Sequence, residues 1–317
     1  MKISVIVPTY NEEEYLPKLL DCLGNQTMER GEFEVIVADA DSTDRTAEIA
    51  REWGATVVPG GLPAVGRNAG AEAAQGDYYF FFDADVKFNK HLLEEAYSEM
   101  QERYIDIATC EARPLSNVAL DRLMHNFANL YLKVNQYTNP VAPGYCILIT
   151  SRLFHRVGGF DENVTHAEDF DLVRRASELR PFRVLENVHI TLSVRRYRKE
   201  GRLAFIGHSI AVSFHRTFKG EITDEDYDYE FGAFDEKSDE SQLRKLERRI
   251  NKLDRRYNRL AKKFRNRKAG ENPNQALTNK LKGIGETVRG LYDQFTSDLD
   301  SADDSTDPES PSNRDSR

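Results

Sequence analysis

The chain has 317 residues, of which 39% are hydrophobic and 31% charged, and its formal net charge is −9. This length allows one sizeable α/β domain and an appendage, and the acidic balance argues against nucleic acid as a main partner. The charge is segregated, because residues 223–240 carry nine acids and one lysine while residues 242–268 carry thirteen bases and two acids.

Neither a secretion signal nor a membrane-spanning segment is predicted. The first residues, MKISVIVPTYNEEEYL, hold an apolar run far too short for a signal peptide. Nowhere do about 18 consecutive apolar residues occur, the length that a transmembrane helix requires. Cys22, Cys110 and Cys146 are widely spaced and include no CxxC pair, so they indicate neither a disulfide framework nor a zinc site. We expect a cytoplasmic protein, with peripheral contact to the cytoplasmic face of the membrane as a further expectation.

Short strands alternate with amphipathic helices over the first 85 residues. Apolar runs between turn residues predict strands, at residues 3–7, 35–38, 56–58 and 78–82. Apolar side chains at helical spacing predict the connecting helices, at residues 13–23, from a cap at 42–44 through 53, and 64–74. This alternation predicts a mainly parallel βαβ sheet with crossover helices.

The pattern is mixed from residue 86 to residue 190. Helices are predicted at residues 90–104, 117–135 and 168–179, and strands near residues 105–111 and 145–150. Residues 203–219 have apolar side chains at steps of four and basic side chains on the other face. This pattern suits an interfacial helix and equally a helix packed on the preceding domain, so both alternatives stay open.

Heptad repeats follow an acidic linker at residues 223–241. Apolar residues alternate steps of three and four from Leu243 to Phe264, and again from Leu277 to Phe295. The Gly/Pro loop between them predicts an αα-hairpin or a coiled-coil dimer. The predicted organisation comprises five parts: an α/β domain at 1–200, an amphipathic helix at 201–222, the linker, a coiled-coil helical hairpin at 242–298 and a disordered acidic tail at 299–317.

Two carboxylates, Asp83 and Asp85, follow the apolar strand YYFFF. At this spacing they can reach one hard divalent cation together, and such a cation neutralises the phosphates of a nucleotide diphosphate. Taken alone, the triplet DAD is more often a solvated turn. Its place at the carboxyl edge of a predicted parallel sheet, where ligands bind in open α/β folds, favours a metal site.

Five segments resemble, in the same order, motifs of the family 2 glycosyltransferases with the GT-A fold. They are SVIVPTYNEEEYL, VIVADADSTDRTAEIA, VGRNAGAEAAQGDYYFFFDAD, PGYCILITSRLFHRVGGFDE and HAEDFDLVRRA. The resemblance covers about 200 residues and implies an α/β fold with a mixed, mainly parallel sheet flanked by helices. It also implies an inverting, metal-dependent glycosyltransferase that uses Mn²⁺ or Mg²⁺ and a nucleotide-sugar donor, with a UDP-sugar as the leading choice.

The resemblance assigns the donor-side roles residue by residue. It implies that Arg67 pairs with a diphosphate oxygen, a task that suits a guanidinium fork. Asp85 is implied as the direct metal ligand, with Asp83 orienting the ribose or the waters on the metal. The nucleoside pocket is implied for Pro8, Tyr10, Asn11, Glu12 and the base-recognising carboxylate Asp39.

The acidic pair Glu168 and Asp169 is the predicted catalytic motif. Inverting transfer needs a carboxylate within hydrogen-bond reach of the acceptor hydroxyl, and Asp169 is the expected general base. Capping of a helix N-terminus is the structural alternative for these two acids, and it is compatible with catalysis.

Two places depart from the family's pattern. Asp41 stands where relatives often have a glycine before Ser-Thr-Asp. The QxxRW-like element of processive synthases is replaced by a cluster in which Arg195 and Arg196 are candidate phosphate contacts. We therefore expect a single-addition enzyme. A third metal ligand was considered but is less favoured than a structural role for each candidate, His166, His189 and His215.

Partners and alternatives follow from the same features. The expected acceptor is a glycan or a polyprenyl-linked saccharide, because the amphipathic stretch and the basic helix favour an anionic membrane surface. The coiled coil suggests a homodimer or a partner protein in a glycosylation complex. A nucleotidyltransferase is disfavoured because PTYNEEEYL lacks a glycine-rich loop with a basic residue. The remaining alternative is a non-catalytic, nucleotide-binding scaffold that acts through the coiled coil.

Overall fold

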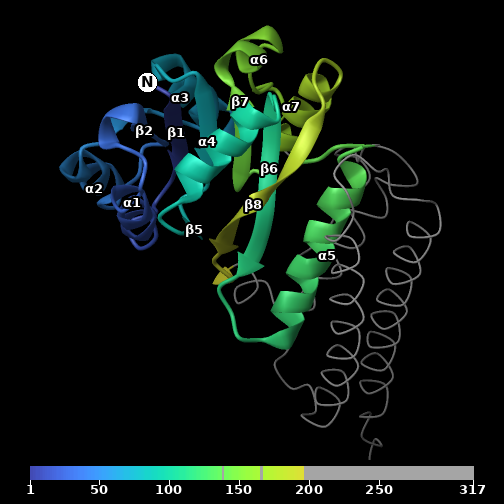
Figure 1. Ribbon diagram of the computed structural model, residues 1–317. Helices are drawn as coiled ribbons and strands as arrows, with labels where there is room; N and C mark the ends of the chain where they lie inside the picture. Colours follow the sequence, from blue (N-terminus) through green and yellow to red (C-terminus); the bar gives the residue numbers. More distant parts are fainter. Residues whose placement is uncertain (138, 165–166, 196–317) are drawn as a thin grey trace, which may run out of the picture. The chain divides into compact units, whose positions relative to one another are not determined.

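The computed structural model describes residues 1–137, 139–164 and 167–195, and Met1–Val194 form one compact unit. Its centre is one eight-stranded sheet with the strand order β3-β2-β1-β4-β7-β6-β8-β5 (Figure 1). Helices cover both faces of this sheet, as the alternating pattern of the sequence predicted.

The first half of the sheet is parallel and matches the predicted strands closely. Its four strands are β1 (Ile3–Thr9), β2 (Phe33–Asp39), β3 (Thr56–Pro59) and β4 (Tyr78–Phe82). β1 lies between β2 and β4 and is parallel to both. The carboxyl ends of these strands therefore meet at one edge, where the loops that follow them can build a common site.

The second half makes the sheet mixed. It consists of β5 (Val86–Lys87), β6 (Ile107–Pro114), β7 (Cys146–Thr150) and β8 (Phe182–Leu192). β7 is antiparallel to both β4 and β6. β8 is parallel to β6, and the edge strand β5 is antiparallel to β8. The predicted mixed, mainly parallel sheet is confirmed.

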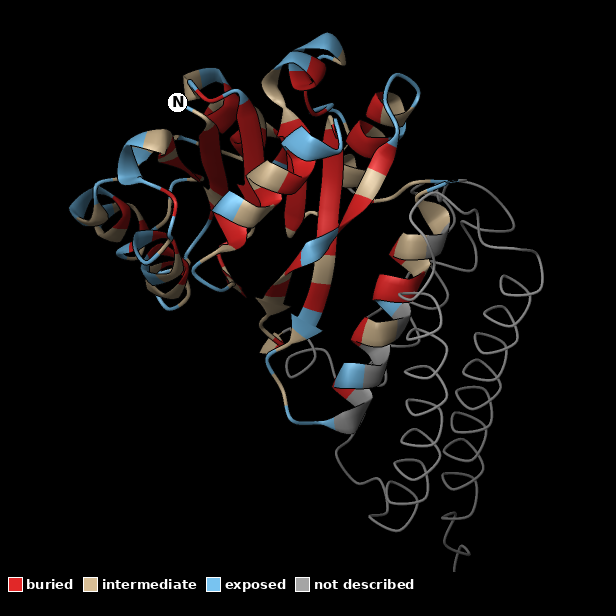
Figure 2. Ribbon diagram, in the orientation of Figure 1, coloured by how far each residue is buried: buried red, intermediate tan, exposed pale blue. Residues whose placement is uncertain are grey.

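Two layers of helices enclose two hydrophobic cores, one on each face of the sheet (Figure 2). One core packs against α1 (Leu16–Gly24), α2 (Thr46–Trp53) and α4 (Leu92–Glu102). The other packs against α3 (Pro63–Ala73), α6 (Ser151–Arg156) and α7 (Glu168–Ser177). β4 faces both cores, with Phe80 and Phe82 on one side and Tyr79 and Phe81 on the other, which explains its uninterrupted apolar run.

The helix α5 (Ala119–Asn135) lies beside β6 (Figure 1). The buried Asn129 amide substitutes for a neighbouring strand, because its Oδ1 accepts from the N–H of Ala112 at 2.9 Å and its Nδ2 donates to the Ala112 carbonyl at 2.8 Å. The Asn129 side chain thus provides hydrogen-bond partners for the backbone N–H and carbonyl of Ala112, which would otherwise be buried without partners.

The strand β8 was not predicted, and neither were the short elements β5, α6 and the 3₁₀ turn Arg30–Glu32. The β8 sequence alternates poorly because its pairing with β6 shifts between Cys110 and Glu111, which face Leu185 and His189. The buried Glu99 carboxylate accepts the N–H groups of Glu186 and Asn187 inside this bulge, at 3.0 and 3.1 Å. A bulge of this kind breaks the two-residue period on which a strand prediction relies.

The predictions for residues 201–317 lie outside the described residues. They are the amphipathic helix, the acidic linker, the coiled-coil hairpin and the disordered tail. Within the described ranges, none of the helices combines the length and the apolar character needed to cross a bilayer.

Candidate active site

The acidic pair after β4 lies where the sequence placed it. Asp83 and Asp85 are half-buried and follow the last residue of β4, at the carboxyl edge of the parallel strands. The ends of β1 and β2 are adjacent, since Thr9 and Asp39 are paired in the sheet. The donor-side candidates therefore share one edge of the fold.

Arg67 is the centre of the charged site. It lies on α3, its side chain is 4% exposed, and its guanidinium bridges two acids from distant parts of the chain. Nη1 donates to Glu168 Oε1 at 2.6 Å, and Nη2 lies 3.1 Å from Asp83 Oδ1. Arg67 thus links the strand end that carries Asp83 with the helix that carries the predicted base.

Glycine at position 144 allows this close approach. The Gly144 carbonyl accepts from Arg67 Nη2 at 3.4 Å. A Cβ atom there would lie 2.7 Å from Arg67 Nη2 and 3.4 Å from Asp169 Oδ2. The loop before β7 therefore passes between the guanidinium and the predicted base, where any side chain would displace one of them.

Asp169 has a carboxyl group whose proton affinity suits a base. Its pKa is raised to about 6, mainly because burial disfavours the charged form and because the neighbouring Glu168 carboxylate repels it. The charge of Arg67 and the backbone N–H groups of Phe170 and Gly144 oppose this rise in pKa. A carboxylate with a pKa near the working pH can accept a proton and release it again.

The backbone just before the acidic pair is strained. Ala167, the N-cap of α7, has φ of 64°, a left-handed conformation that favours glycine. This conformation begins α7 so that Glu168 and Asp169 fall in its first turn. The predicted capping role and the predicted catalytic position are therefore both compatible with the observed helix start.

The base-recognition candidate Asp39 is buried and held in place. Its Oδ1 accepts from Thr9 Oγ1 at 3.0 Å and from Ser42 Oγ at 2.7 Å, while its Oδ2 accepts from the Ser42 N–H at 3.0 Å. Each carboxylate oxygen has two lone pairs, so Oδ2 retains capacity for one more donor. Among the other pocket candidates, Pro8 and Glu12 are half-buried, whereas Tyr10 is 61% exposed.

Two loops that line this edge are joined by side-chain contacts. Asn11 accepts from the N–H of Thr43 at 2.9 Å, and its own N–H donates to Ser42 Oγ at 2.9 Å. Asp41 has φ of 54°, a left-handed conformation that glycine adopts most readily and that aspartate tolerates. Asn11, with φ of 53°, is a second residue of the type that accepts this conformation.

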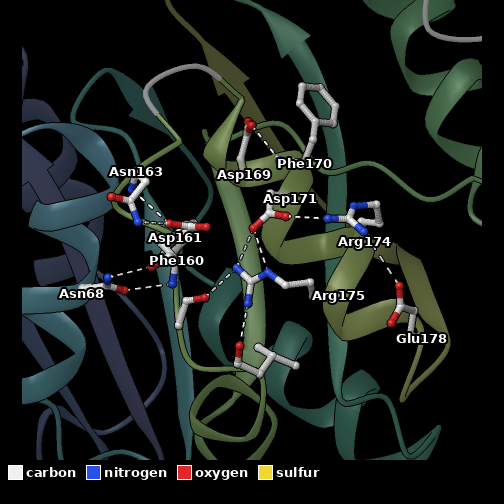
Figure 3. Close-up of polar contacts among 12 residues, drawn as sticks. Asn68, Phe160, Asp161, Asn163, Asp169, Phe170, Asp171, Arg174, Arg175 and Glu178 are labelled. Atoms are coloured by element: carbon white, nitrogen blue, oxygen red, sulfur yellow. Dashed lines mark hydrogen bonds and ion pairs between the residues drawn. The ribbon is translucent and has the colours of Figure 1, made fainter. Parts of the chain in front are cut away.

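A clamp holds the loop that leads to the acidic pair (Figure 3). On one side, Asn68 of α3 accepts from the N–H of Phe160 at 2.9 Å and donates to its carbonyl at 2.9 Å. On the other, Arg175 of α7 donates to the carbonyls of Val157 and Gly159 at 2.6 and 2.8 Å. Arg175 also pairs with Asp171 at 2.7 Å, so the loop is fixed to the helix that carries Asp169.

Replacing Arg175 by lysine is expected to lower kcat roughly 10- to 100-fold, because small misplacements of a reacting group cost that much. Lysine keeps the charge but cannot pair with Asp171 and donate to two carbonyls in one fixed geometry. Steady-state kinetics on the purified variant checks this. The matched control is Arg174→Lys, since Arg174 is half-exposed and pairs with Asp171 and Glu178. Equal kcat values in the two variants would show that the clamp does not position the base.

The structure brings together four of the predicted charged residues and adds others. Arg67, Asp83, Glu168 and Asp169 form one cluster. Within it, the Arg67 guanidinium contacts the carboxylates of Asp83 and Glu168 and the carbonyl of Gly144. Sequence reasoning missed Gly144, Asn68, Thr9, Ser42 and Arg175, whose roles depend on contacts between distant segments.

The remaining candidates contribute less to the described site. Arg195 is half-buried, and Arg196, His166 and His215 lie outside the described residues. His189 is in β8, and burial followed by the charge of Arg113 lowers its pKa. Among described residues, no group of three or more His, Cys, Asp or Glu side chains forms a ready cation site. The predicted pair Asp83 and Asp85 accordingly stays a prediction of two protein ligands.

Comparisons with known proteins agree with this geometry. Residues 4–158 match the model of glycosyl transferase family 2. TarS of Staphylococcus aureus, a poly(ribitol-phosphate) β-N-acetylglucosaminyltransferase, is 36% identical over 115 residues, which cover 34% of this chain and 20% of TarS. The glycosyltransferase AglE of Haloferax volcanii is 27% identical over 189 residues, which cover 56% of this chain and 61% of AglE.

Solved structures share the fold. TarS 1-349 in complex with UDP has a TM-score of 0.53 at 25% identity, with 71% of this chain and 76% of that chain covered. The mannosyltransferase PcManGT of Pyrobaculum calidifontis, in complex with GDP-Man and Mn²⁺, has a TM-score of 0.52 at 22% identity. That match covers 68% of this chain and 64% of the mannosyltransferase.

Residues 4–158 and the fold of the described unit are similar to those of glycosyltransferases. The segment that matches the model of glycosyl transferase family 2 covers just under half of the chain, and it lies in an α/β unit with the GT-A type fold. The predicted resemblance to the family 2 glycosyltransferases is confirmed over this segment. The alignments span a fifth of TarS and about three fifths of AglE.

Proposed function

We propose that this chain transfers a sugar from a nucleotide-sugar to a hydroxyl group of a glycan or polyprenyl-linked acceptor, with inversion at the anomeric carbon. The observation that carries the proposal is the cluster of Asp83, Arg67, Glu168 and Asp169 at the carboxyl edge of the sheet. One buried arginine joins the donor-side acid Asp83 to Glu168. Glu168 is the neighbour of Asp169, whose carboxyl group has a pKa of about 6.

On the donor side, the base is recognised by Asp39. Its unoccupied Oδ2 lone pair can accept an imide N–H, which uracil and guanine both offer. A UDP-sugar is the leading donor, since TarS, the 25% identical structural relative, was solved with UDP. Tyr10 provides an exposed ring for stacking on the base.

On the acceptor side, Asp169 is the general base. It removes the proton from the acceptor hydroxyl while the hydroxyl oxygen attacks the anomeric carbon from the face opposite the leaving nucleotide. The new glycosidic bond forms as the bond to the diphosphate breaks, and the proton stays on Asp169 until it leaves to solvent. Arg67 holds Glu168 beside the base, and this geometry fixes the orientation of Asp169.

The residues after β4 fit a divalent cation. Asp83 and Asp85 offer carboxylate oxygens, the ligands that Mg²⁺ and Mn²⁺ prefer. Arg67 contacts Asp83 through Oδ1, which leaves the second oxygen of that carboxylate for a cation. A cation bound here would neutralise the charge that develops on the leaving diphosphate.

The surroundings of the enzyme belong to the same proposal. A cytoplasmic location with peripheral membrane contact, and a homodimer or partner protein bound through residues 242–298, rest on the sequence patterns alone.

The competing proposal is a nucleotide-binding scaffold without activity. Asp169 speaks against it, because a carboxyl group whose pKa is raised to about 6 beside another acid destabilises the folded protein at neutral pH.

The test is a donor panel with the purified full chain. UDP-, GDP- and dTDP-sugars are supplied with Mn²⁺ or Mg²⁺ and a lipid extract, and release of the nucleotide diphosphate is followed. We expect release from one nucleotide class, with loss of release after chelation and in Asp85→Asn. Nucleotide binding by calorimetry without release from any donor would support the scaffold instead.

A further inference from the structure

A small cavity lies beside Asp85, on the side of β5 and the start of α1. Its volume is about 50 Å³, and its lining includes Tyr15, Lys18, Asp85, Lys87 and Ser193. A cavity of this size accommodates one small polar group. The cavity is therefore suited to a single polar group of a larger molecule that lies along this edge of the sheet.

Lys87 contributes one ammonium group to the lining of this cavity. It is half-buried on β5, two residues after Asp85, and within the described residues its ammonium makes neither an ion pair nor a hydrogen bond. A lysine that loses part of its hydration without a partner is energetically unfavourable. An anion bound in the cavity would compensate this cost.

Lys18 brings a second ammonium to the same cavity. It lies over the Tyr15 ring, 4.6 Å from the centroid, and its acidic neighbour Glu14 is exposed and 3.5 Å away. Exposed pairs of this kind contribute little energy, so the ammonium can exchange Glu14 for a ligand. The lining thus contains two ammonium groups and one carboxylate, Asp85, whose charge a divalent cation would offset.

We propose that Lys18 and Lys87 bind a phosphate-type oxyanion of a substrate in this cavity, whose lining also includes Asp85. The proposal rests on the function proposed above, because it places the cavity beside the proposed donor site. Two substrates could supply the group: the diphosphate of the donor and a phosphate carried by the acceptor. Both offer the same chemistry to an ammonium pair.

The experiment measures binding first, so that it does not depend on turnover. Calorimetry with Mn²⁺ compares UDP, uridine and inorganic pyrophosphate on the wild-type full chain, Lys87→Met, Lys18→Met and the double variant. Lys90→Met is the matched control, since Lys90 is an exposed lysine outside the cavity lining. Lys87→Arg keeps a positive charge at the site and guards against a variant that fails to fold.

A donor phosphate in the cavity predicts that Lys87→Met weakens UDP and pyrophosphate binding about tenfold or more, the usual effect of one charged hydrogen bond. Uridine affinity would stay unchanged, and Lys87→Arg would restore most of the loss. If the cavity binds a phosphate of the acceptor instead, Lys87→Met should leave the affinity for UDP unchanged. It should then raise the KM for a polyprenyl-phosphate acceptor about tenfold or more and leave the KM for an uncharged glycan unchanged.

Unchanged UDP affinity together with unchanged KM for the phosphorylated acceptor in the double variant would overturn the proposal. Equal effects of Lys87→Met and the control Lys90→Met would overturn it as well, because they would reflect net charge alone. Absence of turnover in the wild type, combined with lysine-dependent UDP binding, would reject the proposed function and leave the oxyanion site standing.

Discussion

Asp169→Asn is expected to lower kcat about 10²- to 10⁴-fold, the range that general-base catalysis contributes. Asparagine has nearly the same shape and keeps the acceptor pocket filled, but it cannot take a proton from the acceptor hydroxyl. The affinity for the donor nucleotide should remain close to that of the wild type, because Asp39 and the acids after β4 are untouched. Single-turnover transfer and calorimetry with UDP separate the two effects.

The matched control for this variant is Glu178→Gln. Glu178 follows the same helix and is an exposed carboxylate 3.9 Å from Arg174. Its replacement should leave kcat and donor affinity unchanged. A fully active Asp169→Asn variant would show that another group is the base, and the site would need to be reassigned.

The pH dependence follows from the raised pKa of Asp169, about 6 in the folded protein. The base is active when ionised, so kcat/KM should rise with pH and level off above an apparent pKa near 6. This acidic limb should disappear in Asp169→Asn, whose residual rate would be flat through the same range. A limb that persists in the variant would belong to a different group.

The same shift in pKa makes Asp169 a destabilising residue at neutral pH. A carboxyl group whose folded pKa lies above its unfolded value binds more protons in the folded state, so stability falls as pH rises from about 4 to about 6. Asp169→Asn should therefore be more stable than the wild type at pH 8, by about 1–2 kcal/mol after allowance for solvent access. Urea unfolding at pH 5 and pH 8 measures this, and the gain should shrink at the lower pH.

Local patterns were sufficient to predict most of the α/β scaffold. The runs that became β1, β2 and β4 are buried on both faces and therefore continuous, and their connecting helices carry regular apolar spacing. The prediction failed where a long-range contact supplies the order. β8 is held at its bulge by Glu99, which is 87 residues away from Glu186, and no local signal marks that contact.

The site divides in the same way. Asp83, Asp85 and Asp169 could be predicted because their motifs stand at element ends with a recognisable sequence. The bridge through Arg67 could not be predicted from the sequence, because its two partners, Asp83 and Glu168, lie 16 and 101 positions away from Arg67 along the chain. Arg67 is expected to pair with a diphosphate oxygen. Its observed partners Asp83 and Glu168 show that it also joins the two halves of the site.

Arg67→Met is expected to destabilise the fold by about 2–4 kcal/mol near pH 8, because it leaves two half-buried carboxylates without the cation that they pair with. Asp83 and Glu168 would lose their ion pairs, and Asp169 would lose the positive charge that lowers its pKa. The pKa of Asp169 should rise further, and the acidic limb of the rate profile should move to higher pH. Urea unfolding and the pH–rate profile together measure both consequences.

A second substitution added to Arg67→Met distinguishes an electrostatic cause of the lost stability from a loss of packing. If the loss is electrostatic, the Arg67→Met variant should regain part of its stability when Glu168→Gln or Asp83→Asn is added, or when the pH is lowered so that the acids protonate. If the loss is one of packing against Phe160, whose ring centroid lies 5.4 Å from the guanidinium, neither change should help. Arg67→Lys distinguishes the two further, since one ammonium cannot reach both carboxylates in the bidentate manner of the guanidinium. Recovery of stability without recovery of transfer in the double variants would show that Arg67 is needed to orient the acids as well as to neutralise them.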